Sequence, residues 1–224
     1  MESREPRPCL GRTDALENFP DLESKHLRNR MMAETMAFSD PSRDDEKISG
    51  PLLGPGDPPP YRIENPEGRA DCLLICDHSG QDVPDKLGNL GLEEDDLSRH
   101  FAYDIGVEIL TQRLARLLDA PALFANYSRL VVDVNRRIDH PTAFAATGEG
   151  KPVPGNLSMS AGERELRIHE IYEPYHQAAE SLVGGFLERG VIPVIFSIHS
   201  FTPVFFRQRR PWEVGVLWVQ DERV

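Results

Sequence analysis

The sequence has little of what marks several large classes of protein. Among its 224 residues there are three cysteines, Cys9, Cys72 and Cys76, and their odd number and irregular spacing give no disulfide framework. No apolar run approaches the ~20 residues of a membrane-spanning helix; the run VIPVIFSI at 191–198 has the length of a strand. The N-terminus lacks the apolar core of a signal peptide. These absences predict a cytoplasmic protein with no membrane partner.

Positive charge is also scarce. The chain holds 25 Lys and Arg against 37 Asp and Glu, a formal net charge of −12. Binding to nucleic acid depends on clustered Lys and Arg that neutralise phosphates. The one basic run, RQRR at 207–210, is expected to be a solvated loop in this acidic chain. The composition therefore predicts no nucleic-acid partner.

The chain divides by composition near residue 60. Residues 1–60 hold 9 of the 19 prolines and show no sustained hydrophobic period. They predict a disordered or weakly ordered tail that ends in a Pro/Gly-rich linker at 50–60. Residues 61–224 predict one α/β domain.

Apolar runs and helical periods alternate through this domain. Two long helices are expected, at 93–120 and 160–190, and a long loop at 136–159. In the first helix, the spacing predicts an apolar stripe through Leu97, Phe101, Ile105, Ile109, Leu114, Leu117 and Leu118. The second begins with a capping box, Ser160 and Glu163, and stops at Gly190, with a kink or break at Pro174. Strands are expected at 71–76, 122–126, 129–135, 191–201 and 212–219. This alternation predicts an α/β fold with a mostly parallel sheet that helices cover on both faces.

Two of the expected strands end in a His-Ser pair. The segment LLICDHSGQDVP places His78 after one strand, and FSIHSF places His199 after another. Because the carboxyl ends of parallel strands meet at one sheet edge, the two imidazoles can form a metal site with a carboxylate. Candidates for that carboxylate are Asp77, Asp82 and Asp104. The alternative is two unrelated histidines in turns.

Other polar groups have two readings each. His169, Tyr172, Glu173 and His176 form one stripe of the second helix, which is either a solvated face or the source of one histidine for the site. Arg136 follows an expected strand that also carries Asp133 and Asn135. It is either a surface charge or a clamp for a ligand carboxylate.

Five motifs taken together resemble a known family. CDHSGQDVP, HFAYDIG, YSRLVVDVNR, IYEPYH and SIHSFTP, in this order, closely resemble the N-formylglutamate amidohydrolase family over roughly residues 72–203. The resemblance implies a carboxypeptidase-like, three-layer α/β/α sandwich with a mixed, mostly parallel sheet. It also implies a hydrolase that cleaves the amide bond, a non-peptide C–N bond, of a small N-acyl amino acid.

The resemblance further implies roles for individual residues. The metal, zinc or another divalent ion, would be bound by His78, Asp104 and His199. Arg136, with Asn135 and Arg129, would hold the substrate carboxylate, and His176 would be a catalytic or orienting group.

Two departures from the family pattern leave alternatives open. Where the family commonly has a Glu three residues after the first ligand, this chain has Gln81, so Asp82 or Asp104 must serve. The segment EVGVLW is followed in the family by a late Glu-x-Arg pattern that is expected to supply the general base, and this sequence ends at Val224. The chain is therefore a truncated form, an enzyme with another base, or a catalytically degenerate metal- or ligand-binding member. The sequence leaves the oligomeric state open.

Overall fold

The computed structural model describes residue 48 and residues 50–205 and 208–217. The chain divides into residues 1–46 and a compact unit from residue 47 onward. The expectation of a disordered tail at 1–47 lies outside the described residues. Within them, no helix is long and apolar enough to cross a membrane.

A four-stranded sheet forms the centre of the α/β unit. Its order is β1 (Tyr61–Glu64), β3 (Ala122–Ala125), β2 (Cys72–Cys76) and β6 (Val194–Ser197). Strand β2 runs parallel to both β3 and β6, whereas β1 pairs antiparallel with β3. This confirms the α/β class with a mixed, mostly parallel sheet. Strand β1, which no strong apolar alternation marks, was missed in the sequence.

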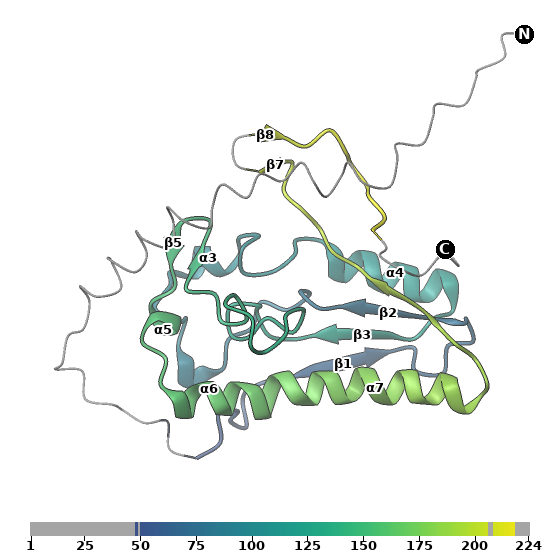
Figure 1. The fold of residues 1–224 in the computed structure, drawn as a ribbon, viewed down its shortest axis with the longest axis horizontal. Coiled ribbons are helices and arrows are strands. Elements are labelled where there is room, and N and C mark those ends of the chain that lie inside the picture. The colour runs from purple at the N-terminus through teal and green to yellow at the C-terminus, as the bar shows by residue number, and fades with distance from the viewer. Residues whose placement is uncertain (1–47, 49, 206–207, 218–224) are drawn as a thin grey trace, which may run out of the picture. The chain divides into compact units, whose positions relative to one another are not determined.

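Helices cover the two faces of this sheet (Figure 1). One apolar cluster joins Phe124 of β3 and Leu74 of β2 to helix α4 (Val107–Leu118). The other joins Leu123 and Ala125 of β3 to helix α7 (Glu173–Glu188). Because successive strand residues point to opposite faces, alternate side chains of β3 enter the two clusters. The result is the expected three-layer α/β/α arrangement.

The helical segment 160–190 is confirmed, with an interruption. It consists of α6 (Ala161–Arg167), a π-helical turn η2 (Ile168–Tyr172) and α7. Ser160 Oγ caps the start by accepting a hydrogen bond of 3.1 Å from the Glu163 N–H. The interruption stands directly before Pro174, which has no N–H to donate.

The expected helix at 93–120 was wrong in its continuity. Only α3 (Glu94–Leu97) and α4 are helical in this segment. Gly106, at φ +82°, is the N-cap residue directly before α4. Helix α4 buries Val107, Thr111 and Ala115 at four-residue spacing, and Val107 and Ala115 pack against Leu74 and Phe124 of the sheet. Of the predicted stripe, Leu97, Phe101 and Leu114 contact the core, whereas Ile105, Ile109, Leu117 and Leu118 are exposed.

Two expected strands are absent from the described residues. Residues 129–135 form turns and irregular backbone, buried except at Arg129 and Asn135, and pair with no strand of the sheet. Residues 212–217 are exposed and form no strand, and 218–219 lie outside the described residues.

Short elements occupy much of the remaining chain. They are η1 (Asp85–Leu87), β4 (Thr147–Gly148), β5 (Lys151–Pro152), α5 (Pro154–Leu157), β7 (Val204–Phe205) and β8 (Gln208–Arg209). The expected loop at 136–159 thus contains the β4–β5 hairpin and α5.

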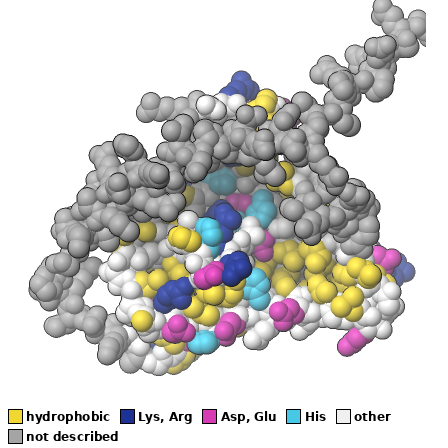
Figure 2. Space-filling model, viewed as in Figure 1, with side chains coloured by type: hydrophobic (Ala, Val, Ile, Leu, Met, Phe, Trp, Pro, Cys, Tyr) yellow, Lys and Arg dark blue, Asp and Glu magenta, His cyan; other side chains and the backbone are white. Residues whose placement is uncertain are grey.

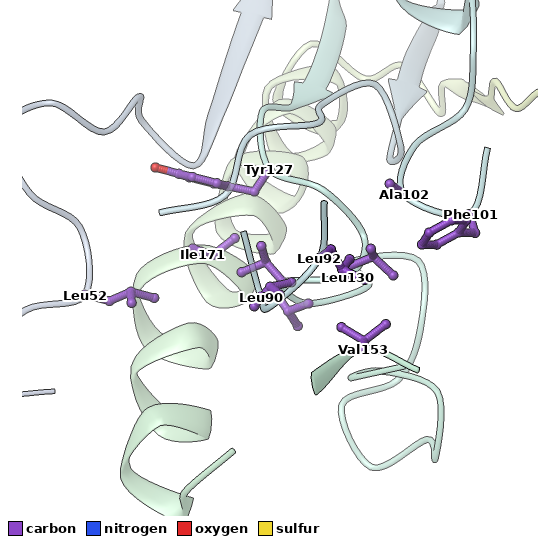
Figure 3. Packing of buried hydrophobic residues seen from close by; sticks show 11 residues of the cluster. Leu52, Leu90, Leu92, Phe101, Ala102, Tyr127, Leu130, Val153 and Ile171 are labelled. Atoms are coloured by element: carbon purple, nitrogen blue, oxygen red, sulfur yellow. The ribbon is translucent and has the colours of Figure 1, made fainter. Parts of the chain in front are cut away.

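A third apolar cluster is built mostly from connecting segments (Figure 3). Leu90, Leu130 and Val153 meet Ile171 of the π turn, together with Leu52 from the Pro/Gly-rich segment 50–60. Leu52 is 0% exposed, and its N–H donates to the Glu170 carboxylate at 2.6 Å. Residues 50–60 therefore belong to the compact α/β unit in the structure, whereas the sequence predicted a linker there.

Gly80 permits the close contact between the loop after β2 and the end of β3. A Cβ atom built on Gly80 would lie 1.9 Å from the carbonyl oxygen of Asn126. We expect Gly80→Ala to lower the free energy of unfolding by at least ~2 kcal/mol, measured by urea denaturation. Gly162→Ala is the control, because its Cβ meets nothing within 4 Å and alanine favours α6. Equal stability of the two variants would contradict the prediction.

Candidate metal centre

The two His-Ser pairs meet at one edge of the sheet, as the sequence predicts. His78 follows β2 and His199 follows the adjacent parallel strand β6, and their ring centroids lie 4.9 Å apart. Asp104, from the turn before α4, completes a group whose ligand atoms all lie within 4.8 Å of one another. The structure brings Asp104 to the histidines, whereas Asp82 is exposed and Gln81 is exposed beside it.

Asp104 is fixed between the two imidazoles. Its N–H donates to the His78 carbonyl at 2.9 Å, which ties its turn to the end of β2. Its Oδ2 lies 2.9 Å from His199 Nδ1 and accepts the Ser200 N–H at 3.2 Å. The same oxygen is 3.6 Å from His78 Nδ1, too far for a hydrogen bond.

A second carboxylate supports His78 on the far side of its ring. Asp133 Oδ1 lies 2.7 Å from His78 Nε2, and both side chains are buried. The ionised carboxylate can only accept a hydrogen bond, so Nε2 carries the proton. Nδ1 of His78 is thereby left facing Asp104.

His199 is supported in a similar way through Ser197. Ser197 Oγ donates to Asp77 Oδ2 at 2.7 Å and lies 2.9 Å from His199 Nε2. Tyr175 OH donates to the other Asp77 oxygen at 2.7 Å. The Asn135 amide nitrogen also approaches His199 Nε2, at 3.3 Å.

The charged groups of the site shift one another's pKa values. The neighbouring Asp104 and Asp77 raise the pKa of His199 to about 9. Burial lowers the pKa of His78, but the carboxylates of Asp104 and Asp133 outweigh it, and the net shift is upward. Burial raises the pKa of Asp104, but His199 and His78 outweigh it and hold that pKa well below its usual value.

These residues fit a divalent metal ion. His78 Nδ1 and Asp104 Oδ1 are buried and have no hydrogen-bond partner among the described residues. Two imidazole nitrogens and one carboxylate are a usual donor set for a catalytic zinc, which keeps a fourth position open. The group could therefore hold a metal ion.

The predicted arginines lie beside this group. Arg129 bridges two buried carboxylates, with Nη1 at 3.5 Å from Asp104 Oδ1 and Nη2 at 3.2 Å from Asp133 Oδ2. Arg136 is less engaged: its side chain is 46% exposed, and its Nε lies 3.9 Å from Asp133. In Figure 2, histidine, arginine and acidic side chains gather near the middle of the visible face.

Three further histidines have separate surroundings. His176 packs against Tyr172 with ring centroids 4.3 Å apart and ring planes at 49°, and its buried Nε2 has no hydrogen bond to a described residue. His100 Nε2 lies 3.0 Å from the Ser200 carbonyl oxygen. His169 lies on the surface against Glu173 and Glu165, as expected of a solvated face.

Several residues support the histidines in ways that the sequence did not predict. Asp77, a candidate ligand in the sequence, instead holds His199 through Ser197 and accepts a hydrogen bond from Tyr175, and Asp133 holds His78. Asp77 and Ser197 stand next to or two residues from the histidines, so their proximity was readable in the sequence. Tyr175 comes from a distant helix, and nothing local in the sequence indicated its contact.

Fold and site together define an α/β/α protein with a candidate metal centre at the carboxyl edge of its sheet. Comparison with known proteins narrows this class. The sequence model of the N-formylglutamate amidohydrolase family matches residues 70–224. Because this match covers more than half of the chain, the chain belongs to this family.

This chain matches only part of the length of the individual relatives described next. An N-formylglutamate deformylase of Pseudomonas putida is 28% identical over 151 residues, 60% of this chain and 53% of the relative. The chain thus spans about half the length of that protein. A gene product of Agrobacterium tumefaciens with a crystal structure is 32% identical, with a TM-score of 0.69 over 71% of this chain and 63% of that one. The crystal structure of N-formylglutamate amidohydrolase from Ralstonia eutropha matches with 25% identity and a TM-score of 0.46, over 63% of this chain and 57% of that one.

The raised pKa of His199 predicts a pH dependence of stability in metal-free protein. Since the pKa rises from 6.5 to about 9 on folding, protonated His199 stabilises the fold fully below pH 6.5. This contribution is lost as the pH rises through about 9. In protein treated with a chelator, we expect the urea midpoint to fall between about pH 7 and about pH 10, and to fall less in His199→Gln. Parallel curves for the two proteins would contradict this.

Proposed function

We propose that this chain catalyses metal-dependent hydrolysis of the amide bond of a small N-acyl amino acid of the N-formylglutamate type. One observation carries the proposal: ligand atoms of His78, Asp104 and His199 converge within 4.8 Å, and two buried atoms among them, His78 Nδ1 and Asp104 Oδ1, have no hydrogen-bond partner among the described residues. Family membership supports the choice of reaction.

The ligands in this proposal are His78, Asp104 and His199, and zinc is the metal that suits them, although another divalent ion could use the same donors. When bound, the metal would lower the pKa of a coordinated water and polarise the acyl carbonyl. The protein would prepare the ligands: Asp133 and the Ser197–Asp77 pair hold the Nε2 atoms, so both rings keep their orientation.

Arg136 would bind the substrate carboxylate, with Asn135 beside it. Its guanidinium is half exposed and, within the part of the chain that the structure describes, has the single ion pair of 3.9 Å to Asp133, so it can offer two N–H groups to a carboxylate. Arg129 is less available because it already bridges Asp104 and Asp133. In this proposal Arg129 contributes mainly by holding those two carboxylates, and substrate orientation depends on Arg136.

His176 is proposed as the further catalytic or orienting group. Its Nε2 is buried without a hydrogen bond to a described residue, so the atom is available to a ligand. Tyr172 packs against the ring and limits its movement.

A second candidate function follows from the hydrogen bonds of the two carboxylates that could otherwise act as general base. Both oxygens of Asp77 accept hydrogen bonds from side chains, and those of Asp133 are engaged by His78, Arg129 and the Asn135 N–H. Among the described residues beside the group, these two carboxylates are therefore not free to take a proton from water. The alternative is a catalytically degenerate member of the family that binds a metal or a ligand. Turnover distinguishes the two functions, whereas metal content does not.

The first test is zinc content together with hydrolysis of N-formylglutamate and other N-acyl amino acids. We expect about one zinc per chain and turnover in the wild type. His199→Ala removes a ligand, so zinc affinity should fall by more than the ~10–100-fold cost of losing an outer-shell partner, and activity should be lost. His140→Ala is the control, since His140 is exposed and its ring, among the described residues, bonds to Thr142 alone. Zinc without turnover would favour the degenerate member, and retained activity in His199→Ala would refute the ligand assignment.

The carboxylate clamp is tested with neighbouring arginines. Arg136→Gln should raise KM for N-formylglutamate by ~10–100-fold, because a charge-assisted hydrogen bond to the substrate is lost. Zinc content should not change. Arg137→Gln serves as the control: this side chain is 86% exposed and pairs with Asp139. Equal KM values for the two variants would rule out Arg136 as the clamp.

A further inference from the structure

The helix that runs from α6 into α7 contains one π turn, directly before Pro174. Here the Glu173 N–H bonds to the carbonyl of Ile168, five residues earlier. Pro174 offers no N–H to the carbonyl of Glu170, so an ordinary α-helical ladder could not continue through this point. Such turns are rare and are frequent at functional sites.

Three side chains of this helix hold the loop that carries Arg129, Asp133 and Arg136. Each donates a hydrogen bond to a backbone carbonyl of that loop: Arg164 to Ile138 at 2.7 Å, Arg167 to Val131 at 3.0 Å, and Tyr172 to Arg136 at 2.9 Å. Arg167 is fully buried, and its guanidinium also bonds to Asn156 at 2.6 Å. The loop thus takes hydrogen bonds from side chains where a strand would take them from a neighbouring strand.

The spacing of Arg167 and Tyr172 requires the π turn. In a continuous α-helix, residues advance by ~100° each, so two residues five apart point ~140° away from each other. A π turn closes its hydrogen bond over five residues and brings such a pair back to one side of the helix. Both side chains can therefore reach the same loop.

The Tyr172 contact falls on the residue proposed to bind the substrate. The Arg136 N–H donates to the Asp133 carbonyl at 3.0 Å, and its own carbonyl accepts from Tyr172. The backbone of Arg136 is thus held on both sides, while its half-exposed guanidinium is left to a ligand.

We infer that Tyr172 is a positioning residue for Arg136, and that the π turn sets the helical register that brings Tyr172 to it. The inference rests on the proposed function, because it concerns how the clamp for the substrate carboxylate is oriented.

The first test removes one hydroxyl. Tyr172→Phe keeps the ring against His176 but loses the bond to the Arg136 carbonyl, so KM for N-formylglutamate should rise by ~3–10-fold. Zinc content and kcat should stay within about twofold of the wild type, a split that general destabilisation does not produce. Tyr127→Phe is the matched control, since its hydroxyl also donates to a carbonyl, that of Pro58 at 2.6 Å, and its KM should not change.

The outcomes separate this inference from the proposed function. Wild-type turnover with equal KM in the two Phe variants overturns the inference and leaves the function standing. A wild type without turnover overturns the proposed hydrolase activity. Native-state hydrogen exchange then tests whether the Tyr172 hydroxyl holds the backbone of Arg136. Tyr172→Phe should speed exchange at the Arg136 amide, which donates to the Asp133 carbonyl, and unchanged exchange there overturns the inference.

The register itself is tested at His169, an exposed residue of the π turn whose ring pairs with Glu165 and Glu173. Deleting His169 leaves Arg167 and Tyr172 four residues apart, and a continuous α-helix places such a pair ~40° apart, on the same side, so KM should stay within about twofold of the wild type. Inserting one alanine after His169 places them six residues apart, ~120° from each other in an α-helix, and should raise KM at least as much as Tyr172→Phe. An insertion variant that keeps its helical circular dichroism and has wild-type KM overturns the role of the register; if the insertion variant does not fold, the Tyr172→Phe pair decides.

Discussion

The burial of the Asp104 carboxylate between two imidazoles is the constraint on which the site depends. The Asp104 side chain is 2% exposed, and a carboxylate so removed from water is costly unless charges and hydrogen bonds compensate it. His199, Ser200 and Arg129 supply this compensation, and His78 completes the surroundings. Because His78 and His199 follow adjacent parallel strands, the β2–β6 pairing must be in register for Asp104 to be tolerated at all.

This constraint reaches into parts of the fold that touch no ligand atom. The Asp104 N–H bonds to the His78 carbonyl, so the turn that delivers Asp104 is fixed before α4 begins at Val107. A straight helix from 93 to 120 would not produce this turn. The left-handed backbone of Gly106 separates the turn from the helix, and α4 then covers the sheet with Val107, Thr111 and Ala115.

What the sequence predicted correctly was local. Strands β2 and β6 are short apolar runs bounded by polar turns, the cap at Ser160 is a local pattern, and a His-Ser pair after each strand indicated a shared sheet edge. The errors were of another kind. The apolar run at 129–135 has the composition of a strand, but it forms turns that pair with no strand of the sheet, and composition alone does not show which runs find a partner. Similarly, hydrophobic size favoured Ile109 and Leu117 as buried positions, whereas the buried residues of α4 are Val107, Thr111 and Ala115. Asp133 gained its importance from the same non-local geometry, since it reaches His78 from a buried loop across 55 residues of sequence.

The charges of the site balance in a way that links its metal-free and proposed metal-bound states. Three buried carboxylates, Asp77, Asp104 and Asp133, carry three negative charges. Without a metal, the raised pKa of His199, about 9, favours its imidazolium form at neutral pH, the carboxylates shift the pKa of His78 in the same direction, and Arg129 adds a fixed positive charge. A divalent ion held by these residues would take the place of protons on the imidazoles, so positive charge would still oppose the carboxylates. The buried environment therefore needs little rearrangement between the two states, and the fixed charge of Arg129 is the part of the balance that neither state can lose.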